Sequence, residues 1–120
     1  MAFIPEFILR GLYQRKSLKS IPEGTQMTLV NSLAFDVLVK FTPLQFDGKP
    51  YPPNKTQVSN GEQTMLGSEM SAANSFKLLK STPITVLLLG HKLTKGDHRI
   101  KFEFEAKAVG VLKFEVTDAA

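Results

Sequence analysis

Strict alternation of apolar and charged side chains near the carboxyl end constrains the fold of this chain more than any other feature. Between Arg99 and Lys107 apolar residues occupy every second position, and the same period of two returns after Val109-Gly110. The apolar positions are Ile100, Phe102, Phe104 and Ala106 in the first segment and Leu112, Phe114 and Val116 in the second. Successive side chains on a β-strand point to opposite faces, so each segment has one apolar and one charged face. The pattern predicts two strands joined by one turn, in a sheet that is packed on one side.

Turn signals along the rest of the chain predict further short strands. Asp47-Gly48 and Asn60-Gly61 suit hairpins, and Pro22-Glu23-Gly24 suits a turn. The expected strands are 6–13, 15–21, 26–33, 36–46, 55–59, 62–66 and 83–89, and the one expected helix is 68–74. We therefore expect an all-β fold over residues 1–120: a single immunoglobulin-like, two-sheet antiparallel sandwich with about 7–9 strands and one short helix.

The composition is that of an ordinary globular protein without thiol chemistry. The chain has 120 residues, 42% of them hydrophobic and 22% charged, and it has no cysteine. Disulfides, thiol nucleophiles and cysteine-ligated metals are therefore excluded. The longest strongly apolar run, Ile84 to Leu89, is much shorter than the roughly 20 residues that span a bilayer. The amino end lacks a basic head before an apolar stretch, so we expect no secretory signal, and a cytoplasmic protein with no cofactor and no membrane partner.

The segment Leu93–Phe102 resembles the entry to the penultimate strand of immunoglobulin-like and fibronectin type III-like sandwiches. Those families often show a leucine, a glycine turn, a tyrosine or histidine, and then alternating apolar residues. In this chain Gly96, Asp97 and His98 provide the turn and the ring. The resemblance implies that these three residues form a structural corner in which the His98 side chain hydrogen-bonds the backbone.

Three stretches, Phe7–Tyr13, Phe46–Lys49 and Gly96–Ile100, are arranged somewhat as in small uncharacterised archaeal sandwich proteins. They are also similar to the small, β-rich subunit of C-glycoside deglycosidases. In those enzymes the metal and most catalytic residues belong to a larger, barrel-shaped subunit. The resemblance therefore implies an accessory or oligomeric role, with no catalytic residue carried over to this chain.

Side chains that could support catalysis or bind a metal are sparse. His91 and His98 are the only imidazoles, neither lies in a nucleophile motif, and Asp97 beside His98 is the best candidate for orienting a base. These three residues also lack the spacing of a known metal motif. Glu103 and Glu105 share one strand face, where they more simply form the wet side of the sheet than the acid pair of a glycosidase. We expect no catalytic residue, no metal site and no enzyme activity of the chain by itself.

The net charge of +4 comes from twelve lysines and three arginines against eleven acidic residues. The densest basic cluster is Arg10, Arg15, Lys16 and Lys19, with Tyr13 among them. A basic surface with stacking aromatics is typical of nucleic-acid binding, which gives one alternative function. Lysines supply point charges rather than the planar contacts of arginine, so a dispersed lysine surface favours the simpler reading of solubility.

Apolar residues at two places exceed what one buried face can absorb. They lie near the amino end and in the expected strand 83–89. Surplus apolar surface often marks a protein interface, and the candidate interface comprises Phe3, Phe7, Ile8, Leu9, Leu87 and Leu89. We predict a non-catalytic module that acts through protein–protein association, with itself as a homo-oligomer or with a larger subunit. The alternatives are an accessory small subunit of a sugar-processing enzyme and a small basic nucleic-acid-binding protein.

Overall fold

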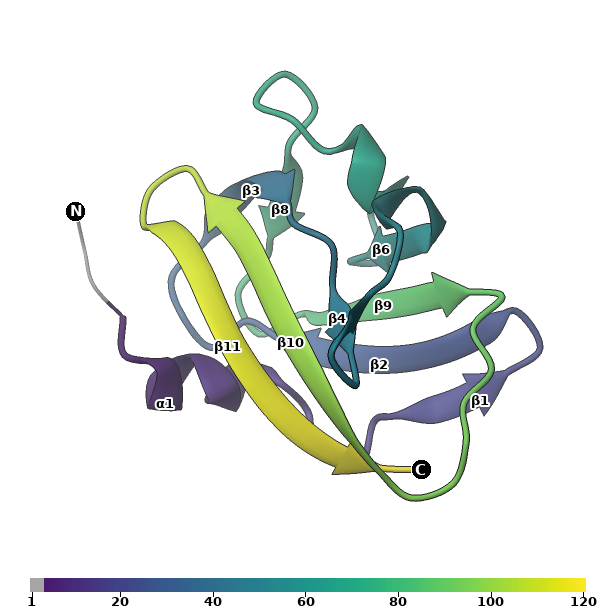
Figure 1. Cartoon of the computed structure of the whole chain (residues 1–120). Coiled ribbons are helices and arrows are strands. Elements are labelled where there is room, and N and C mark those ends of the chain that lie inside the picture. Colours follow the sequence, from purple (N-terminus) through teal and green to yellow (C-terminus); the bar gives the residue numbers. More distant parts are fainter. Residues whose placement is uncertain (1–3) are drawn as a thin grey trace.

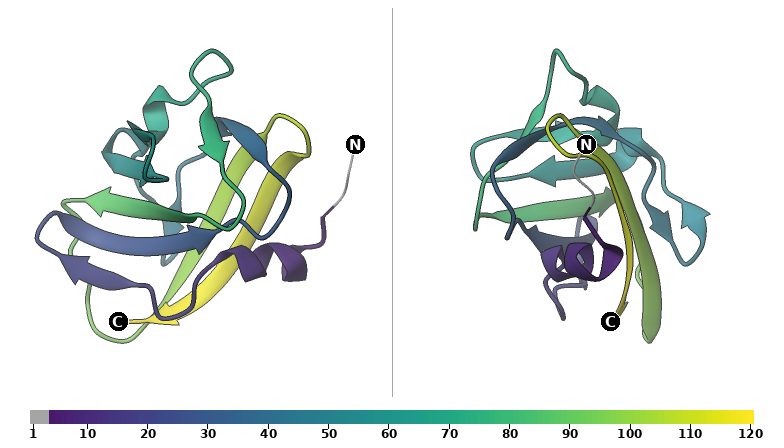
Figure 2. Two further views of the ribbon diagram at one scale, coloured as in Figure 1. Left: turned by 180° about the vertical axis from the view of Figure 1, so that it is seen from behind. Right: turned by 90° about the vertical axis from the view of Figure 1, so that its left-hand side faces the viewer.

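The computed structural model describes residues 4–120 and shows two antiparallel β-sheets packed against each other (Figures 1 and 2). The first sheet has the order β1 (Lys19–Ile21), β2 (Gly24–Val30), β9 (Pro83–Leu89), β6 (Thr56–Ser59) and β7 (Thr64–Leu66). The second has the order β5 (Lys49–Pro50), β4 (Gln45–Phe46), β10 (Asp97–Ala106), β3 (Asp36–Phe41) and β8 (Phe76–Leu78), and β11 (Gly110–Ala119) pairs along the other side of β10. This confirms the expected all-β, two-sheet antiparallel sandwich. Nine of the eleven strands found in residues 4–120 have three or more residues.

The alternating segments near the carboxyl end are confirmed as β10 and β11, which pair along their whole length and cross the first sheet in Figure 1. Ile100, Phe102, Phe104 and Ala106 point into the core and are at most 3% exposed. Phe102 lies opposite Phe114, and their rings stack with centroids 5.2 Å apart. Phe104 meets Phe114 edge to face. The period of two in the sequence therefore builds the centre of the core.

Both glycine turn signals lie between paired strands, as predicted. Asp47 and Gly48 join β4 to β5 with φ of 53° and 81°. Positive φ at both central residues defines the hairpin turn that Asp-Gly favours. Asn60 precedes the second glycine, and its side-chain oxygen accepts the N–H groups of Glu62 and Gln63 at 2.9 and 2.8 Å, which closes the loop between β6 and β7.

The strand expected at 6–13 is wrong, because this segment is the helix α1 (Glu6–Leu9) followed by a 3₁₀ turn (Arg10–Leu12). Leu9, Leu12 and Tyr13 are all buried, and their spacing of i, i+3 and i+4 is that of one helix face. The apolar residues thus follow the helical period, but the segment is too short for this period to be distinguished from the alternation of a strand. No helix within residues 4–120 is long and apolar enough to cross a membrane.

Other expected elements are broken or shorter than the sequence predicts. The strand expected at 36–46 is two strands, β3 and β4, interrupted at residues 42–44 around Pro43. The strand expected at 26–33 ends earlier, as β2, and the one expected at 62–66 begins later, as β7. The strand expected at 15–21 is limited to β1. The helix expected at 68–74 is only a 3₁₀ turn, Gly67–Glu69. Residues 71–74 form their own turn instead, because the backbone N–H of Ser71 and that of Asn74 each donate to the other's carbonyl at 3.1 Å. Met70 is the one large apolar side chain of residues 68–74, which is too little to form the apolar face of a helix.

Helix α1 covers part of the free edge of β11. The Arg10 side chain donates to the Glu115 carbonyl at 3.1 Å, and the Glu115 N–H donates to the Glu6 carboxylate at 3.3 Å. Glu6 and Arg10 also form a 2.8 Å ion pair with each other. Unpaired strand edges invite pairing with other chains, and here one ion pair satisfies both backbone groups of Glu115. Association of this module through the middle of β11 is therefore disfavoured.

The Asp118 carboxylate ties the carboxyl end of β11 to the segment after α1. It accepts the Tyr13 hydroxyl at 2.7 Å and the backbone N–H groups of Lys16 and Leu18 at 3.3 Å. It also accepts the Ala119 N–H at 2.9 Å. Burial alone would raise the pKa of Asp118, but these hydrogen bonds to the charged form outweigh it and hold the pKa below its ordinary value. Burial raises the pKa of Tyr13, so this phenol stays neutral and donates.

Candidate functional site

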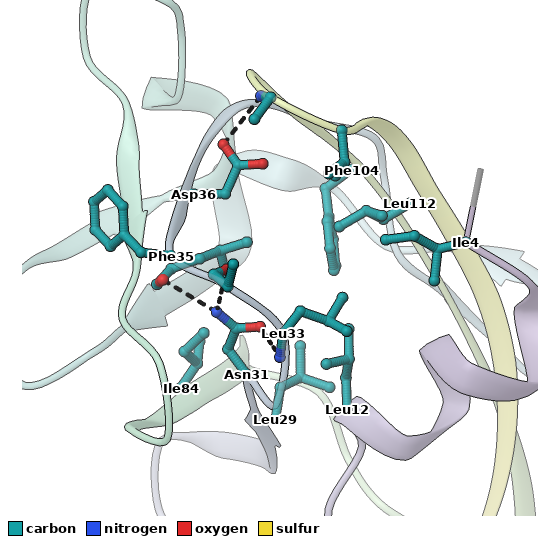
Figure 3. Close-up of a pocket in the computed structure, with 14 residues that line it drawn as sticks. Ile4, Leu12, Leu29, Asn31, Leu33, Phe35, Asp36, Ile84, Phe104 and Leu112 are labelled. Carbon is teal, nitrogen blue, oxygen red and sulfur yellow. Dashed lines mark hydrogen bonds between the residues drawn. The ribbon is translucent and has the colours of Figure 1, made fainter. Parts of the chain in front are cut away.

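A cavity of about 290 Å³ lies at one end of the sandwich, where three separate parts of the chain meet (Figure 3). Its walls come from the β2–β3 loop and adjoining strand ends, from the amino-terminal segment, and from the β10–β11 hairpin. Most of the lining is apolar, and it includes Ile4, Leu12, Leu29, Ile84, Phe104 and Leu112. A cavity with apolar walls and a few polar groups is typical of a ligand site.

Asn31 and Asp36 are the two lining residues with polar side chains. Asn31 is buried and fully engaged. Its amide nitrogen donates to the carbonyls of Ala34 and Leu78 at 3.3 and 3.1 Å, and its oxygen accepts the Leu33 N–H at 3.0 Å. Asn31 therefore fixes the β2–β3 loop against the end of β8, and its donors are already used.

Asp36 is engaged through one oxygen only. Its Oδ1 accepts the backbone N–H groups of Val37 and Ala108 at 2.7 and 3.1 Å, which ties the start of β3 to the β10–β11 hairpin. The residue is 8% exposed, and its buried Oδ2 has no hydrogen-bond partner within residues 4–120. Figure 3 shows this oxygen turned toward the space beside Phe104. Buried polar atoms are nearly always paired, so an unpaired one needs an explanation. Within residues 4–120, Oδ2 is the cavity acceptor that remains available to a ligand.

The exposed large apolar side chains belong to three parts of the chain that lie on one side of the molecule. Within residues 4–120 they are Phe7, Ile8, Phe35 and Val111, which are 72%, 41%, 56% and 58% exposed. Phe7 and Ile8 lie on α1, Phe35 on the β2–β3 loop and Val111 on β11 beside the hairpin. Figure 1 shows these three parts on one side of the molecule, and the loop and the hairpin also line the cavity. We call these four residues the apolar end.

The candidate interface residues from the sequence are not all on one surface. Phe7 and Ile8 are exposed at the apolar end, whereas Leu9 is 3% exposed and belongs to the core. Leu87 is 8% exposed, and Leu89 is half-buried on the same strand, β9. Phe3 lies outside the described residues. Leu9 and Leu87 therefore offer little surface to a partner, and Leu89 is not next to the apolar end.

Leu87 is buried although it lies on the outer face of the first sheet. The inner face of β9 consists of Ile84, Val86 and Leu88. Leu87 lies between Gln26 on β2 and Gln57 on β6, directly opposite both. Residues 4–120 by themselves leave Leu87 only 8% exposed, so its burial does not require a partner subunit.

Two members of the apolar end, Phe35 and Val111, were not singled out by the sequence reasoning. Val111 carried a signal, because it occupies a wet-face position of β11, directly opposite Glu105, where the alternation calls for a polar residue. Phe35 follows Asn31 by four residues in a loop, and no periodicity marks a loop residue as exposed.

The expected structural corner places the His98 ring between two acceptors. Gly96 has φ of 111°, a conformation suited to glycine, and Asp97 is exposed. The buried His98 ring donates to the Asp47 carboxylate and to the Thr94 carbonyl, each at 2.7 Å. Since both ring nitrogens face acceptors, the geometry favours the cation. The hydrogen bond to Asp47 raises the pKa of His98, and the same bond lowers the pKa of Asp47.

His91 lies close to this corner without joining it. Its Nδ1 is 2.7 Å from the Thr25 hydroxyl oxygen, and the Phe46 ring contacts both imidazoles, with centroids 4.5 Å from His91 and 5.1 Å from His98. Burial and the nearby His98 cation lower the pKa of His91. Within residues 4–120 there is no group of three or more metal-ligating side chains. Both nitrogens of His98 are already used, so this ring is not placed to act as a base.

We expect the free energy of unfolding to fall as the pH rises through the folded-state pKa of His98. The folded pKa is raised above the ordinary value of 6.5, so the cation stabilises the fold fully below about pH 6.5 and loses this contribution as the pH increases. Asp47→Asn removes the charged partner and should lower the unfolding free energy by about 1 kcal/mol near pH 6, because Asp47 is half exposed. Urea unfolding between about pH 5.5 and 8.5 measures this effect. A variant that keeps the full wild-type pH dependence would contradict the assignment.

The other side chains considered for chemistry are dispersed. Glu103 and Glu105 lie across from Lys113 and Lys40 on the neighbouring strands, as expected for the outer face of the sheet. In the basic cluster Tyr13 is only 5% exposed, so its ring is not free to stack on a base. The geometry therefore singles out the cavity and the apolar end as the candidate site.

The comparison with protein families extends over nearly the whole sandwich. Residues 8–120 match the family model described as hydroxymethylglutaryl-CoA reductase, N-terminal domain. No curated protein matches the chain. The matched residues run from α1 to the last residue of the chain and include every strand of both sheets. The chain therefore belongs to the family of the hydroxymethylglutaryl-CoA reductase N-terminal domain.

Proposed function

We propose that this chain is a non-catalytic β-sandwich module that acts by protein–protein association through its apolar end. The observation that carries the proposal is that Phe7, Ile8, Phe35 and Val111 are exposed and belong to three parts of the chain, α1, the β2–β3 loop and the start of β11, that lie on one side of the molecule in Figure 1. Exposed large apolar side chains gathered in one region, rather than scattered, are typical of a binding surface. Aromatic residues such as Phe7 and Phe35 are also enriched at the centres of protein interfaces.

The state of the titratable groups supports a non-catalytic role. His98 is held between Asp47 and the Thr94 carbonyl, and Asp118 accepts four hydrogen bonds that join elements of the fold. Groups whose donors and acceptors are satisfied by the fold have none left for a substrate. His98 and Asp118 therefore have structural roles, and the apolar end is the surface that we expect a partner protein to bind.

The family match suggests the partner. A domain of this family is named as the N-terminal part of hydroxymethylglutaryl-CoA reductase, so the surface that the apolar end contacts would belong to the remaining, catalytic part of such a reductase. A second copy of this chain is the other candidate. We also propose an immunoglobulin-like strand arrangement, which Leu93–Phe102 suggests, together with a cytoplasmic location and an accessory-subunit role.

Isothermal titration of the chain with the catalytic part of a reductase from the same organism tests the partner. The double variant Phe7→Ser, Val111→Ser should weaken binding at least about tenfold, because it removes two apolar anchors. Leu89→Ser is the matched control, since Leu89 was also a candidate but lies away from the apolar end, and it should bind within about twofold of the wild type. Loss of binding in the Leu89 variant with no loss in the double variant would contradict the proposal. Light scattering of the chain alone detects association with a second copy.

A further inference from the structure

We propose that the cavity beside Asp36 binds a small neutral amphiphile, a molecule with an apolar body and one hydroxyl group that donates to Asp36 Oδ2. This assignment concerns a ligand site in the chain itself and needs no protein partner. It is therefore independent of the proposed association, and its test uses the isolated chain.

The walls of the cavity select an apolar body. Leu12, Ile84, Phe104 and Leu112 approach it from four different elements, and all are nearly buried in the core. The volume of about 290 Å³ is roughly twice that of an engineered cavity that takes up benzene, so about ten heavy atoms fit. An aliphatic chain of that length would bury its carbons against these side chains.

One acceptor in the cavity is free, and its position is fixed. Asp36 Oδ1 is held by the N–H groups of Val37 and Ala108, which sets the orientation of the carboxyl group and points Oδ2 into the cavity. Oδ2 has no partner among residues 4–120, although the residue is only 8% exposed. An unpaired buried acceptor is costly, and a ligand that supplies a donor there removes that cost.

The number of free acceptors favours a hydroxyl over an ammonium group. An ammonium carries three donors, and within residues 4–120 the other polar side chain that lines the cavity is Asn31, which makes two donations of its own and whose oxygen already accepts the Leu33 N–H and has one lone pair left. At least one of the three ammonium donors would therefore meet apolar walls. A hydroxyl has one donor, which matches the single free oxygen.

The ligand can enter from the β2–β3 loop side. Phe35 and Ala34 are exposed at this side of the cavity, and Leu33 and Val109 are half-buried there. Figure 3 shows the Phe35 ring turned away from the space between the other lining residues. Ala34→Trp places a large ring at this mouth without touching the core, whereas Ala73→Trp adds the same ring to an exposed loop that does not line the cavity.

The test compares two isomers, n-octanol and heptyl methyl ether, which have the same heavy atoms but differ in the O–H donor. Titrations followed by NMR of the methyl groups of Ile84 and Leu112 give the affinities. The wild type should bind the alcohol saturably and at least about tenfold more tightly than the ether, as expected when the alcohol hydroxyl pairs a buried acceptor that the ether leaves unpaired. Ala34→Trp should abolish binding of both probes, and Ala73→Trp should leave both affinities unchanged.

Asp36→Asn gives the decisive comparison. The amide oxygen must take the place of Oδ1 to keep the N–H groups of Val37 and Ala108, so the amide nitrogen replaces Oδ2 and presents a donor. The preference for the alcohol should therefore fall to within about twofold. Three results would overturn the proposal. The wild type could bind the two probes equally, the preference for the alcohol could survive in Asp36→Asn, or neither probe could shift the methyl NMR signals, which would leave water alone in the cavity. The wild-type comparison stands even where the variant does not fold.

Discussion

Replacing Asp118 with alanine will lower the free energy of unfolding by roughly 3–5 kcal/mol, as measured by urea unfolding near pH 7. The change leaves the buried Tyr13 hydroxyl and the N–H groups of Lys16 and Leu18 without their acceptor. These bonds join residues about one hundred positions apart, so their loss also frees the segment between α1 and β1 from the end of β11. The cost of unpaired buried donors is larger than the value of an ordinary hydrogen bond.

Asp97→Ala is the control for this prediction. Asp97 starts the neighbouring strand opposite Ala119 but is exposed, so its loss should change the unfolding free energy by less than about 0.5 kcal/mol. Because the folded pKa of Asp118 is lowered, its stabilisation is present above the unfolded value near 3.8 and is lost as the pH falls through the folded value. Asp118→Asn should therefore flatten the loss of stability in acid. Equal stability of Asp118→Ala and Asp97→Ala would show that the network does not hold the amino-terminal segment.

Replacing Phe114 with alanine will cost about 4 kcal/mol of unfolding free energy. Phe114 is 1% exposed, stacks on Phe102 and meets Phe104 edge to face, so its removal leaves a cavity between two rings at the centre of the sandwich. Phe7→Ala makes the same change at a residue that is 72% exposed, and it should cost less than about 0.5 kcal/mol. Thermal and urea unfolding of both variants measure the contrast. A large loss in Phe7→Ala would mean that Phe7 belongs to the core rather than to the apolar end.

Strict alternation was sufficient to predict β10 and β11 because each position has only two faces to choose from. Once one face of β10 is apolar, burial decides which residues of β11 face the core, whereas the pairing of Phe102 with Phe114 is known only from the structure. The Asp47-Gly48 turn could be predicted for a similar reason, since few residue pairs tolerate positive φ at both positions. Such features depend on local geometry alone.

The amino-terminal segment and the cavity could not be predicted in this way. Leu9, Leu12 and Tyr13 fit a helix, but their burial depends on β11, which is about one hundred residues later in the chain. The cavity likewise requires Leu12, Ile84 and Leu112 to meet across long separations. No local pattern shows that Asp36 keeps one oxygen unpaired, because that depends on which backbone groups reach it.

The most direct test of the central claim is amide hydrogen exchange of the chain with and without the catalytic part of a reductase from the same organism. We predict slower exchange in α1, the β2–β3 loop and the β10–β11 hairpin, the three parts that carry Phe7, Phe35 and Val111. The corner around His98 should exchange at the same rate in both samples. Protection confined to that corner or to the outer face of β9, or no protection at any site, would contradict association through the apolar end.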